Sequence, residues 1–244
     1  MHWNVGVNFT HNQNKITKLT KTDDPNYPGV DVGGIAGGVG NLIQNNRVGF
    51  PVNSFYTFEQ IYDVNGMPIE GLYVDRTGNG GEVISNNLNK YHNHSPAPNY
   101  LMGINTSLDY KNILFSFSGR VSVGNYVYNN VQSERSRYSS LYNQAGYFNN
   151  LPQAIEDSEF VNPQYWSDFY LEDASFFKMD NMSLGYNFDQ LGSKGKLKAK
   201  IGFTVQNAFY ISRYSGIDPE VDGGIDNNIY PRPRVFLLGI NLTY

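Results

Sequence analysis

One glycine-rich segment has residues whose types and spacing could bind a calcium ion. In "DRTGNGGE", at 75–82, Asp75, Thr77 and Asn79 occupy alternating positions ahead of a glycine, as the first oxygen ligands of a calcium loop do. The twelfth position holds Asn86 instead of the glutamate that completes such a loop. The segment therefore has two interpretations, a calcium site or a Gly/Asn turn.

A second acidic segment, "GIDPEVDGGID" at 216–226, offers the carboxylates of Asp218, Glu220, Asp222 and Asp226 in a loop rich in proline and glycine, and Asp218 and Asp222 are its weak calcium candidates. Calcium binding, docking of a partner and a solvated acidic loop all fit this composition. His92 and His94 could face the same side of a strand, but no third metal ligand accompanies them. Calcium is therefore the one cofactor that the sequence leaves open, and no other metal is predicted.

Aromatic residues among Asn and Gln are concentrated in the segment 125–173. Aromatic rings cover the C–H faces of sugars while amides bind their hydroxyl groups, and Tyr and Trp are also common in protein interfaces. Packing of the segment on itself is the structural alternative. The candidates for contact with a substrate or with a partner that covers it are Tyr138, Tyr142, Tyr147, Tyr165, Trp166, Tyr170 and, from the next link, Tyr214.

Catalytic motifs are not found in the chain. The segment "GGIAGGVGN" lacks the lysine of a phosphate-binding loop, and neither a nucleophile elbow nor a His-Glu-x-x-His motif occurs. The absence of cysteine excludes thiolate chemistry, and a net charge of -4 argues against nucleic acid as a partner. We therefore do not expect an enzyme.

The elements that would position these residues are β-strands. No run of about 18 apolar residues is present, so no membrane-spanning helix is predicted. Apolar residues instead alternate with small or polar ones, the period of a strand with two different faces. The predicted strands are 3–9, 101–110, 112–123, 176–188, 197–206, the C-terminal strand ending at Tyr244, and a weaker seventh, "VNSFYTFEQIY", whose alternation is broken.

The lengths of the links favour a transmembrane barrel. Short turns at 109–112 and 189–196 contrast with long links at about 64–98, 125–173 and 210–232, as periplasmic turns contrast with outer loops in such barrels. Residues 12–49 break this pattern, because they should lie on the turn side yet are long. In a barrel the polar face of the strands lines the lumen. The predicted lumen-facing residues are Asn105, Asp109, Arg120, Asn181, Thr204, Gln206 and Asn241.

A soluble β-sandwich that binds carbohydrate is the alternative from another class. Its strands also alternate, but unstructured links longer than about 12–15 residues are unusual in compact domains. We therefore expect an all-β fold, made of about seven antiparallel strands of a transmembrane barrel.

Five blocks of sequence carry a family resemblance. They are, in order, "NKITKL" at 14–19, "VGFPVNSFYTFEQ" at 48–60, "SFFKMDNMSLGYNF" at 175–188, "VQNAFYISRYSGIDPEV" at 205–221 and "YPRPRVFLLGINLTY" at 230–244. In this order the chain resembles the C-terminal part of the SusC/RagA family of TonB-dependent outer-membrane transporters.

The resemblance implies a 22-stranded barrel closed by an N-terminal plug. It also implies a SusD-like lipoprotein that acts as a lid, and energy supplied by the TonB complex for import of glycans or peptides. The expected location is the outer membrane of a Gram-negative bacterium of the Bacteroidota. The family's signal peptide, plug and TonB box have no counterpart here, so we expect the chain to be part of a larger transporter, with the TonB complex acting through the missing N-terminal part. The family also has a long region at the position of 12–49.

The C-terminal strand also fits the resemblance, because the barrel-assembly machinery recognises terminal strands that end on an aromatic residue. Tyr244 would then lie at the periplasmic interface, in contact with outer-membrane lipid. The residues of this predicted assembly signal are Phe236, Leu238, Ile240, Leu242 and Tyr244.

Overall fold

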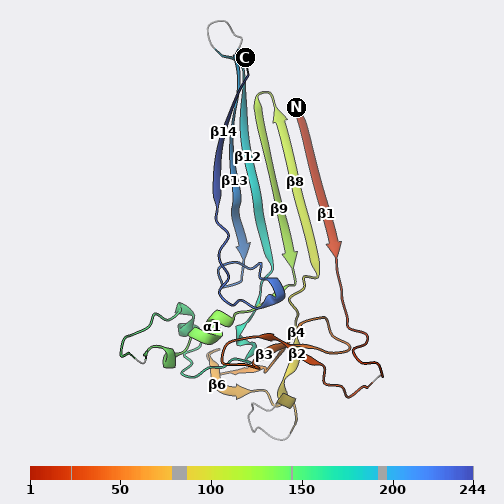
Figure 1. Ribbon diagram of the computed structural model, residues 1–244, viewed down its shortest axis with the longest axis vertical. Coiled ribbons are helices and arrows are strands. Elements are labelled where there is room, and N and C mark those ends of the chain that lie inside the picture. Colours follow the sequence, from red (N-terminus) through yellow and green to blue (C-terminus); the bar gives the residue numbers. More distant parts are fainter. Residues whose placement is uncertain (23, 79–86, 144, 192–196, 244) are drawn as a thin grey trace.

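The computed structural model describes residues 1–244 with the exception of 23, 79–86, 144, 192–196 and 244. It consists of a tall, single-layered β-sheet and a region of shorter elements beyond one end of that sheet (Figure 1). We refer to this second part as the loop-end region. The smaller sheets lie beyond the end of the large sheet and not over its faces, so the second layer of a β-sandwich is not seen among the described residues.

The large sheet has six antiparallel strands in the order β1-β8-β9-β12-β13-β14. Neighbours in the sheet follow one another along the chain, so the sheet is an up-and-down meander with β1 and β14 at its edges. The strands are β1 (His2–His11), β8 (Tyr100–Tyr110), β9 (Ile113–Val123), β12 (Phe176–Leu191), β13 (Leu197–Ser212) and β14 (Val235–Thr243). This architecture confirms the prediction of antiparallel strands from a partial transmembrane barrel.

One face of the sheet is apolar and uncovered. In β1, Trp3 and Val7 have 66% and 63% of their surface exposed, and in β14 Leu238 has 70%. Their neighbours two residues away in each strand are also large and apolar, because successive side chains of a strand alternate between the faces. This face, which we call the apolar face, extends across all six strands.

The opposite face is polar, and the register of the strands places all seven predicted lumen-facing residues on it. Residues paired across antiparallel strands point to the same side. Asn105 pairs with Ser118, Ser118 with Asn181, and Asn181 with Gln206, which gives one polar row across four strands. A second row joins Ser183 to Thr204, whose hydroxyl groups are hydrogen-bonded at 2.7 Å.

The expected seventh strand at 52–62 is not part of this sheet. Its residues form β4 (Ser54–Thr57) and β5 (Gln60–Tyr62), which belong to two small sheets of the loop-end region. Phe55, Thr57 and Phe58 are all buried, so the segment has core on both sides and cannot turn one face to lipid.

As a result, the chain leaves the sheet after β1 and returns to it at β8 at the same end. Residues 12–49 therefore lie with the long links and not on the turn side, where the sequence had placed them (Figure 1). β8 and β9 are then joined by a short turn at the opposite end. The alternation of short and long links is restored once 12–99 is counted as one long link.

The loop-end region has its own hydrophobic core. Ile35, Ile43, Phe55, Tyr128, Phe160 and Tyr170 form a buried cluster that joins the links before β8 and after β9. The remaining elements here are β2 (Val30–Gly34), β3 (Leu42–Asn46), β6 (Pro68–Tyr73), η1 (Asn87–Asn89), β7 (Tyr91–Asn93), β10 (Tyr126–Tyr128), α1 (Asn130–Arg135), η2 (Tyr138–Ser140), η3 (Gln153–Asp157), η4 (Asp168–Tyr170), β11 (Leu171–Asp173) and η5 (Asp222–Gly224).

The order of pairing in the small sheets is β2-β3-β4-β7, β5-β6 and β10-β11. Among the described residues, no helix is both long enough and apolar enough to span a membrane.

Candidate functional site

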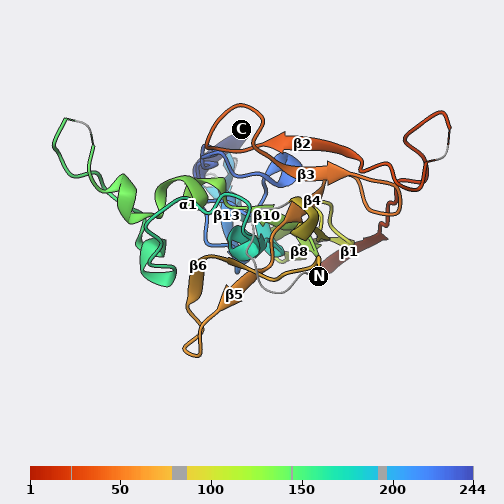
Figure 2. The ribbon, with the colours of Figure 1, turned by 90° about the horizontal axis from the view of Figure 1, so that it is seen from below.

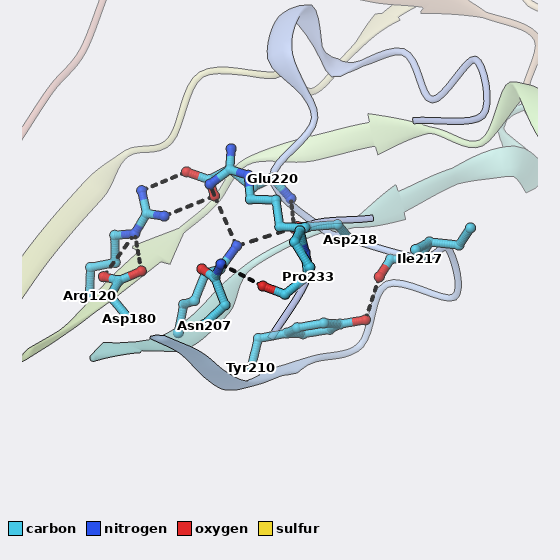
Figure 3. A network of polar contacts seen from close by, with 10 residues as sticks. Arg120, Asp180, Asn207, Tyr210, Ile217, Asp218, Glu220 and Pro233 are labelled. Carbon is cyan, nitrogen blue, oxygen red and sulfur yellow. Dashed lines mark hydrogen bonds and ion pairs between the residues drawn. The ribbon is translucent and has the colours of Figure 1, made fainter. Parts of the chain in front are cut away.

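Glu220 holds the link between β13 and β14 on the polar face of the sheet. Its carboxylate accepts hydrogen bonds from Arg120 Nη1 at 2.6 Å and Nη2 at 2.9 Å, which is the bidentate geometry that arginine provides. Lys178 Nζ lies 3.2 Å from Glu220 Oε2, and Arg232 Nη1 lies 2.6 Å from the same oxygen. One carboxylate therefore joins cations from two strands and from its own link (Figure 3).

Two further carboxylates complete this charge network. Lys178 in β12 is 3% exposed, and its Nζ also lies 3.3 Å from Asp218 Oδ2. Arg120 in β9 donates from Nε to Asp180 at 3.2 Å. Three cations thus meet three carboxylates, so no net charge is left against the sheet. A buried lysine is tolerated only with such partners.

Local turns aim the acidic residues of the link at the sheet. The backbone N–H of Glu220 donates to Asp218 Oδ1 at 3.0 Å, and Pro219 between them is fully buried. On either side of these residues, Tyr210 donates to the carbonyl of Ile217 at 2.6 Å and Asn207 Nδ2 to that of Pro233 at 3.0 Å. These contacts hold both ends of the link against β13 (Figure 3).

The same link is also folded on itself and bound to the other links of the loop-end region, because Tyr214 packs in a buried cluster with Val127 and Ala174. Tyr214 is 6% exposed and donates its hydroxyl to Asp226 Oδ2 at 2.7 Å. Burial, and then the hydrogen bond and charge of Asp226, raise the pKa of Tyr214 far above its usual value, so the phenol stays protonated as a donor. Gln44 Nε2 donates to the carbonyl of Gly223 at 2.7 Å. The link is therefore fixed from both sides.

A cavity of about 1040 Å³ lies between this link and the polar face of the first strands. Asn8 and Thr10 of β1 line one side, and Arg120, Glu220, Asp222 and Arg232 line another. Its walls carry charges of both signs beside amide and hydroxyl groups. Such a surface can bind polar ligands, or another polar segment of protein, without preferring one sign of charge.

The structure corrects two of the predicted contact residues. Tyr170 is 1% exposed in the core of the loop-end region, and Tyr214 is buried against Asp226. Neither side chain can touch a ligand or a covering protein, so the prediction is wrong for both. Their large apolar rings fill the core, which was the structural alternative.

Tyr165 and Trp166 are partly buried against the same core. Trp166 Nε1 donates to the carbonyl of Leu42 at 3.1 Å, and Tyr165 Oη accepts from Arg137 Nη1 at 2.8 Å. Both polar ends are thus satisfied within the chain. Contact with a ligand or a partner stays a prediction for these two residues.

Tyr138, Tyr142 and Tyr147 are exposed, the last two at 67% and 72%. Tyr142 and Phe148 pack on each other with ring centroids 5.1 Å apart. Tyr138 lies in η2, and Tyr142 and Tyr147 lie in the segment between η2 and η3, which projects away from the rest of the molecule (Figure 2). Contact with a partner or substrate therefore stays a prediction for these three tyrosines.

The calcium candidates do not come together as a site in the described residues. Asp218 is bound to Lys178, and Asp222 lies in η5 beside the large cavity. Asp75 Oδ1 accepts from the backbone and hydroxyl of Thr77 at 2.8 and 2.6 Å, which is an Asx turn, while Asn79 lies outside the described residues. The described part of the chain contains no group of three or more His, Cys, Asp or Glu residues arranged to hold a metal ion.

The predicted assembly signal lies on the apolar face. Phe236, Leu238, Ile240 and Leu242 are 60–70% exposed along β14, and Tyr244 lies outside the described residues. Recognition by the assembly machinery stays a prediction.

The sequence did not single out Lys178, Asp180 or Arg232, nor did it pair Glu220 with a cation. The sequence signal for this charge network was weak. The letters "KMD" place a lysine and an aspartate in a predicted strand of a chain with only 16% charged residues, and an acidic link follows later in the chain. Contacts such as that between Arg120 and Glu220, which are 100 residues apart, depend on the strand order and have no signature in local spacing.

Comparison with curated proteins places this architecture in a family, although no model of a known protein family matches the chain. The chain is 42% identical over 248 residues to the TonB-dependent receptor SusC of Bacteroides thetaiotaomicron, a match that covers 99% of the chain and 24% of SusC. It is 27% identical over 279 residues to the TonB-dependent receptor P3 of Formosa agariphila, a match that covers 99% of the chain and 27% of P3. The chain thus spans about a quarter of the length of these relatives.

Solved structures agree on the fold. The RagAB peptide transporter matches 98% of the chain, with a TM-score of 0.66 and 22% identity, and the chain covers 27% of it. The RagAB peptide importer in its open-open state gives a TM-score of 0.67, and the match covers 99% of the chain and 27% of the importer chain. The six-stranded sheet, its long links at one end and the similarity to SusC together show that the chain belongs to the SusC/RagA family of TonB-dependent receptors and is a portion of the transmembrane barrel.

Proposed function

We propose that this chain forms part of the wall of an outer-membrane importer, with its apolar face against lipid and its polar face toward the transport path. The observation that carries the proposal is the separation of the two faces. Large apolar side chains are uncovered on one side, and a charge network holds a link over the other.

An uncovered apolar face of this size is unfavourable in water. Leu184, Phe203 and Ile240 are 54%, 45% and 60% exposed on three different strands, so the surface is continuous and not a scatter of single residues. In lipid the same face needs no protein cover. The strands also suit a bilayer, because β8 and β9 have 11 residues each, and a tilted strand needs about 9–11 residues to cross.

The loop-end region would face the outside of the cell, with the short turn between β8 and β9 in the periplasm. The exposed rings of Tyr138, Tyr142 and Tyr147 would then contact a SusD-like lipoprotein lid, because exposed Tyr side chains provide large, rigid contact area in interfaces. A polar path suits glycans or peptides. Import would be driven by the TonB complex, and β14 would carry the signal for the barrel-assembly machinery.

The proposal is tested first by fractionation of the source cells. An antibody to the 210–232 link is used on immunoblots of membrane and soluble fractions, with samples left unheated or boiled. We expect a band in the outer-membrane fraction whose migration shifts on boiling, because folded barrels resist detergent unfolding. A band that is confined to the soluble fraction and whose migration does not change on boiling would overturn the proposal.

A matched pair of variants tests the two faces. Leu238→Lys puts a charge on the apolar face of β14, which costs about 2–4 kcal/mol at the middle of a bilayer. Asn241→Lys puts the same charge on the polar face of the same strand. We expect the first variant to lower the outer-membrane level of the protein and the second to leave it unchanged; equal levels would contradict the assignment of the faces.

A further inference from the structure

A second, smaller cavity lies in the loop-end region where the chain enters β8. It has a volume of about 400 Å³ and is lined by residues from three segments, 50–54, 92–99 and 124–126. The strap Pro96–Pro98 separates it from the large cavity, since Ser95 and Asn99 line the small cavity while the residues between them line the large one. We call the small cavity the His94 pocket.

Two stacked pairs of rings form flat walls of the His94 pocket. Phe50 and His92 stack with centroids 3.9 Å apart and planes 14° apart, and His94 and Tyr126 stack at 3.6 Å and 3°. His92 is further fixed because Tyr56 packs at 4.9 Å and its Nε2 lies 3.0 Å from Asn45 Oδ1. The walls are thus rigid before any ligand arrives, which lowers the entropy lost on binding.

The pocket also gathers polar groups that are available for a ligand. The Ser95 hydroxyl, the Asn99 amide, the Tyr126 hydroxyl and the His94 ring nitrogens make no hydrogen bond to another described residue. The backbone at these positions is fixed: Tyr126 N donates to Ser95 O at 3.1 Å, and Asn99 N donates to Val123 O at 2.9 Å. Donors and acceptors are therefore presented from a fixed frame.

The side chains that line the His94 pocket are uncharged. None of its lining residues is Asp, Glu, Lys or Arg. Burial is the largest cause that lowers the pKa of both histidines, to about 4 for His92, so both imidazoles are neutral at pH 7. Charges of both signs lie around the pocket, since Arg47 and Asp31 act on His92 and Asp173 acts on His94, but a charged ligand would find no charged side chain among the lining residues to pair with, which is unfavourable.

From the stacked walls and the free neutral donors and acceptors, we infer that the His94 pocket binds an uncharged sugar ring. Aromatic faces cover the C–H side of a pyranose, and hydroxyl, amide and imidazole groups pair with its hydroxyls. The inference rests on the proposed importer and selects, from its two substrate classes, a neutral glycan. The pocket would hold one ring of that glycan beside the entrance to the large cavity.

The test uses the protein as cells make it, purified in detergent, and saturation-transfer NMR with the methyl pyranosides of glucose, galactose and mannose. Glucuronate serves as the charged sugar and the dipeptide Pro-Phe as the peptide probe. We expect saturation transfer to at least one methyl pyranoside and none to glucuronate. Transfer to Pro-Phe alone, or to no neutral sugar, would overturn the inference.

Variants locate the binding. Asn99→Ala removes an exposed side chain without touching the core, and Tyr126→Phe removes only a hydroxyl; each should weaken sugar binding about tenfold. Tyr230→Ala removes a ring that is 89% exposed and does not line the pocket, so it should leave binding unchanged. Binding that is unaffected by both pocket variants would contradict the inference. Localisation is measured separately by the fractionation experiment. If the protein is found in the membrane but binds no sugar, only this inference is overturned. If it is found in the soluble fraction, the proposed importer is overturned.

Discussion

The charge network predicts how firmly the link between β13 and β14 is held, and Lys178→Met tests it. The substitution keeps most of the volume of the side chain and removes the one cation that is buried among the described residues. Among the described residues, Asp218 then keeps its bond from the backbone N–H of Glu220, at 3.0 Å, and Glu220 keeps both arginines. Removal of one partner from a buried ion pair costs about 3–5 kcal/mol. Because both carboxylates keep other partners, we expect the lower end, about 3 kcal/mol.

This free energy should appear as easier local opening of the link and not as unfolding of the sheet. Since about 1.4 kcal/mol corresponds to a factor of ten in an equilibrium constant, the open population should rise by about two orders of magnitude. Hydrogen–deuterium exchange read by mass spectrometry measures it at Gly224 and Asp226, whose backbone N–H groups bond to Val221 and Tyr128.

The matched control is Lys200→Met, which removes an exposed lysine from the same polar face in β13. It should leave exchange in 218–226 unchanged. Unchanged exchange in Lys178→Met as well would refute the reasoning, because the network would then not hold the link. Faster exchange throughout β12 and β13 would also refute it, since it would make Lys178 a general determinant of stability.

Three further predictions concern the loop-end region. Tyr214→Phe removes the hydroxyl that donates to Asp226 and should lower the free energy of unfolding by about 1.5–3 kcal/mol in denaturant titrations. Tyr230→Phe, on a ring that is 89% exposed, is the control and should leave the free energy of unfolding unchanged. Equal free energies of unfolding for the two variants would contradict the role of this bond. Gly224→Ala should cost about 1–3 kcal/mol, because φ is +75° and the new Cβ would lie 2.4 Å from Pro96 Cβ; Gly202→Ala, with no atom within 4 Å, is the control, and a stable Gly224→Ala protein would argue against the strain. Burial lowers the pKa of His92 to about 4 from 6.5, so its contribution is present above pH 6.5 and is lost as pH falls toward 4, where the unfolded chain binds the proton more readily. The melting temperature of His92→Gln should therefore depend less on pH between 7.5 and 5 than that of the unchanged protein or of His2→Gln, and identical pH dependence would contradict this.

The strands of the large sheet could be predicted because each has one apolar face and one polar face. In β1 large apolar residues alternate with small or polar ones throughout, and in β14 they do so from Leu238 onward, so the period of two is plain. The prediction that 52–62 is a strand of the large sheet failed for the opposite reason. Phe55, Thr57 and Phe58 are buried on both sides of a short strand, and the broken alternation was the only sequence signal that this segment has no lipid-facing side.

The candidate site was predictable only in part. The polar face follows from alternation, so residues such as Asn105 and Asn181 could be placed together before their strands were paired. Aromatic composition could not separate the buried Tyr170 from the exposed Tyr147, since both have the same type of side chain and stand in similar surroundings in the sequence. The pairing of Lys178 with Asp218 depends on how the link folds back over the sheet, which no local pattern encodes.

The central claim is that one face of the sheet meets lipid and the other meets water. The chain has no cysteine, so single cysteines at each position of β14 can carry a spin label in the assembled protein. Electron paramagnetic resonance then compares collision with oxygen, which is enriched in lipid, and with a water-soluble nickel chelate. The account predicts a period of two, with oxygen maxima at Phe236, Leu238, Ile240 and Leu242 and nickel maxima at Leu237, Gly239 and Asn241. Equal access of the nickel chelate to both sets would contradict it.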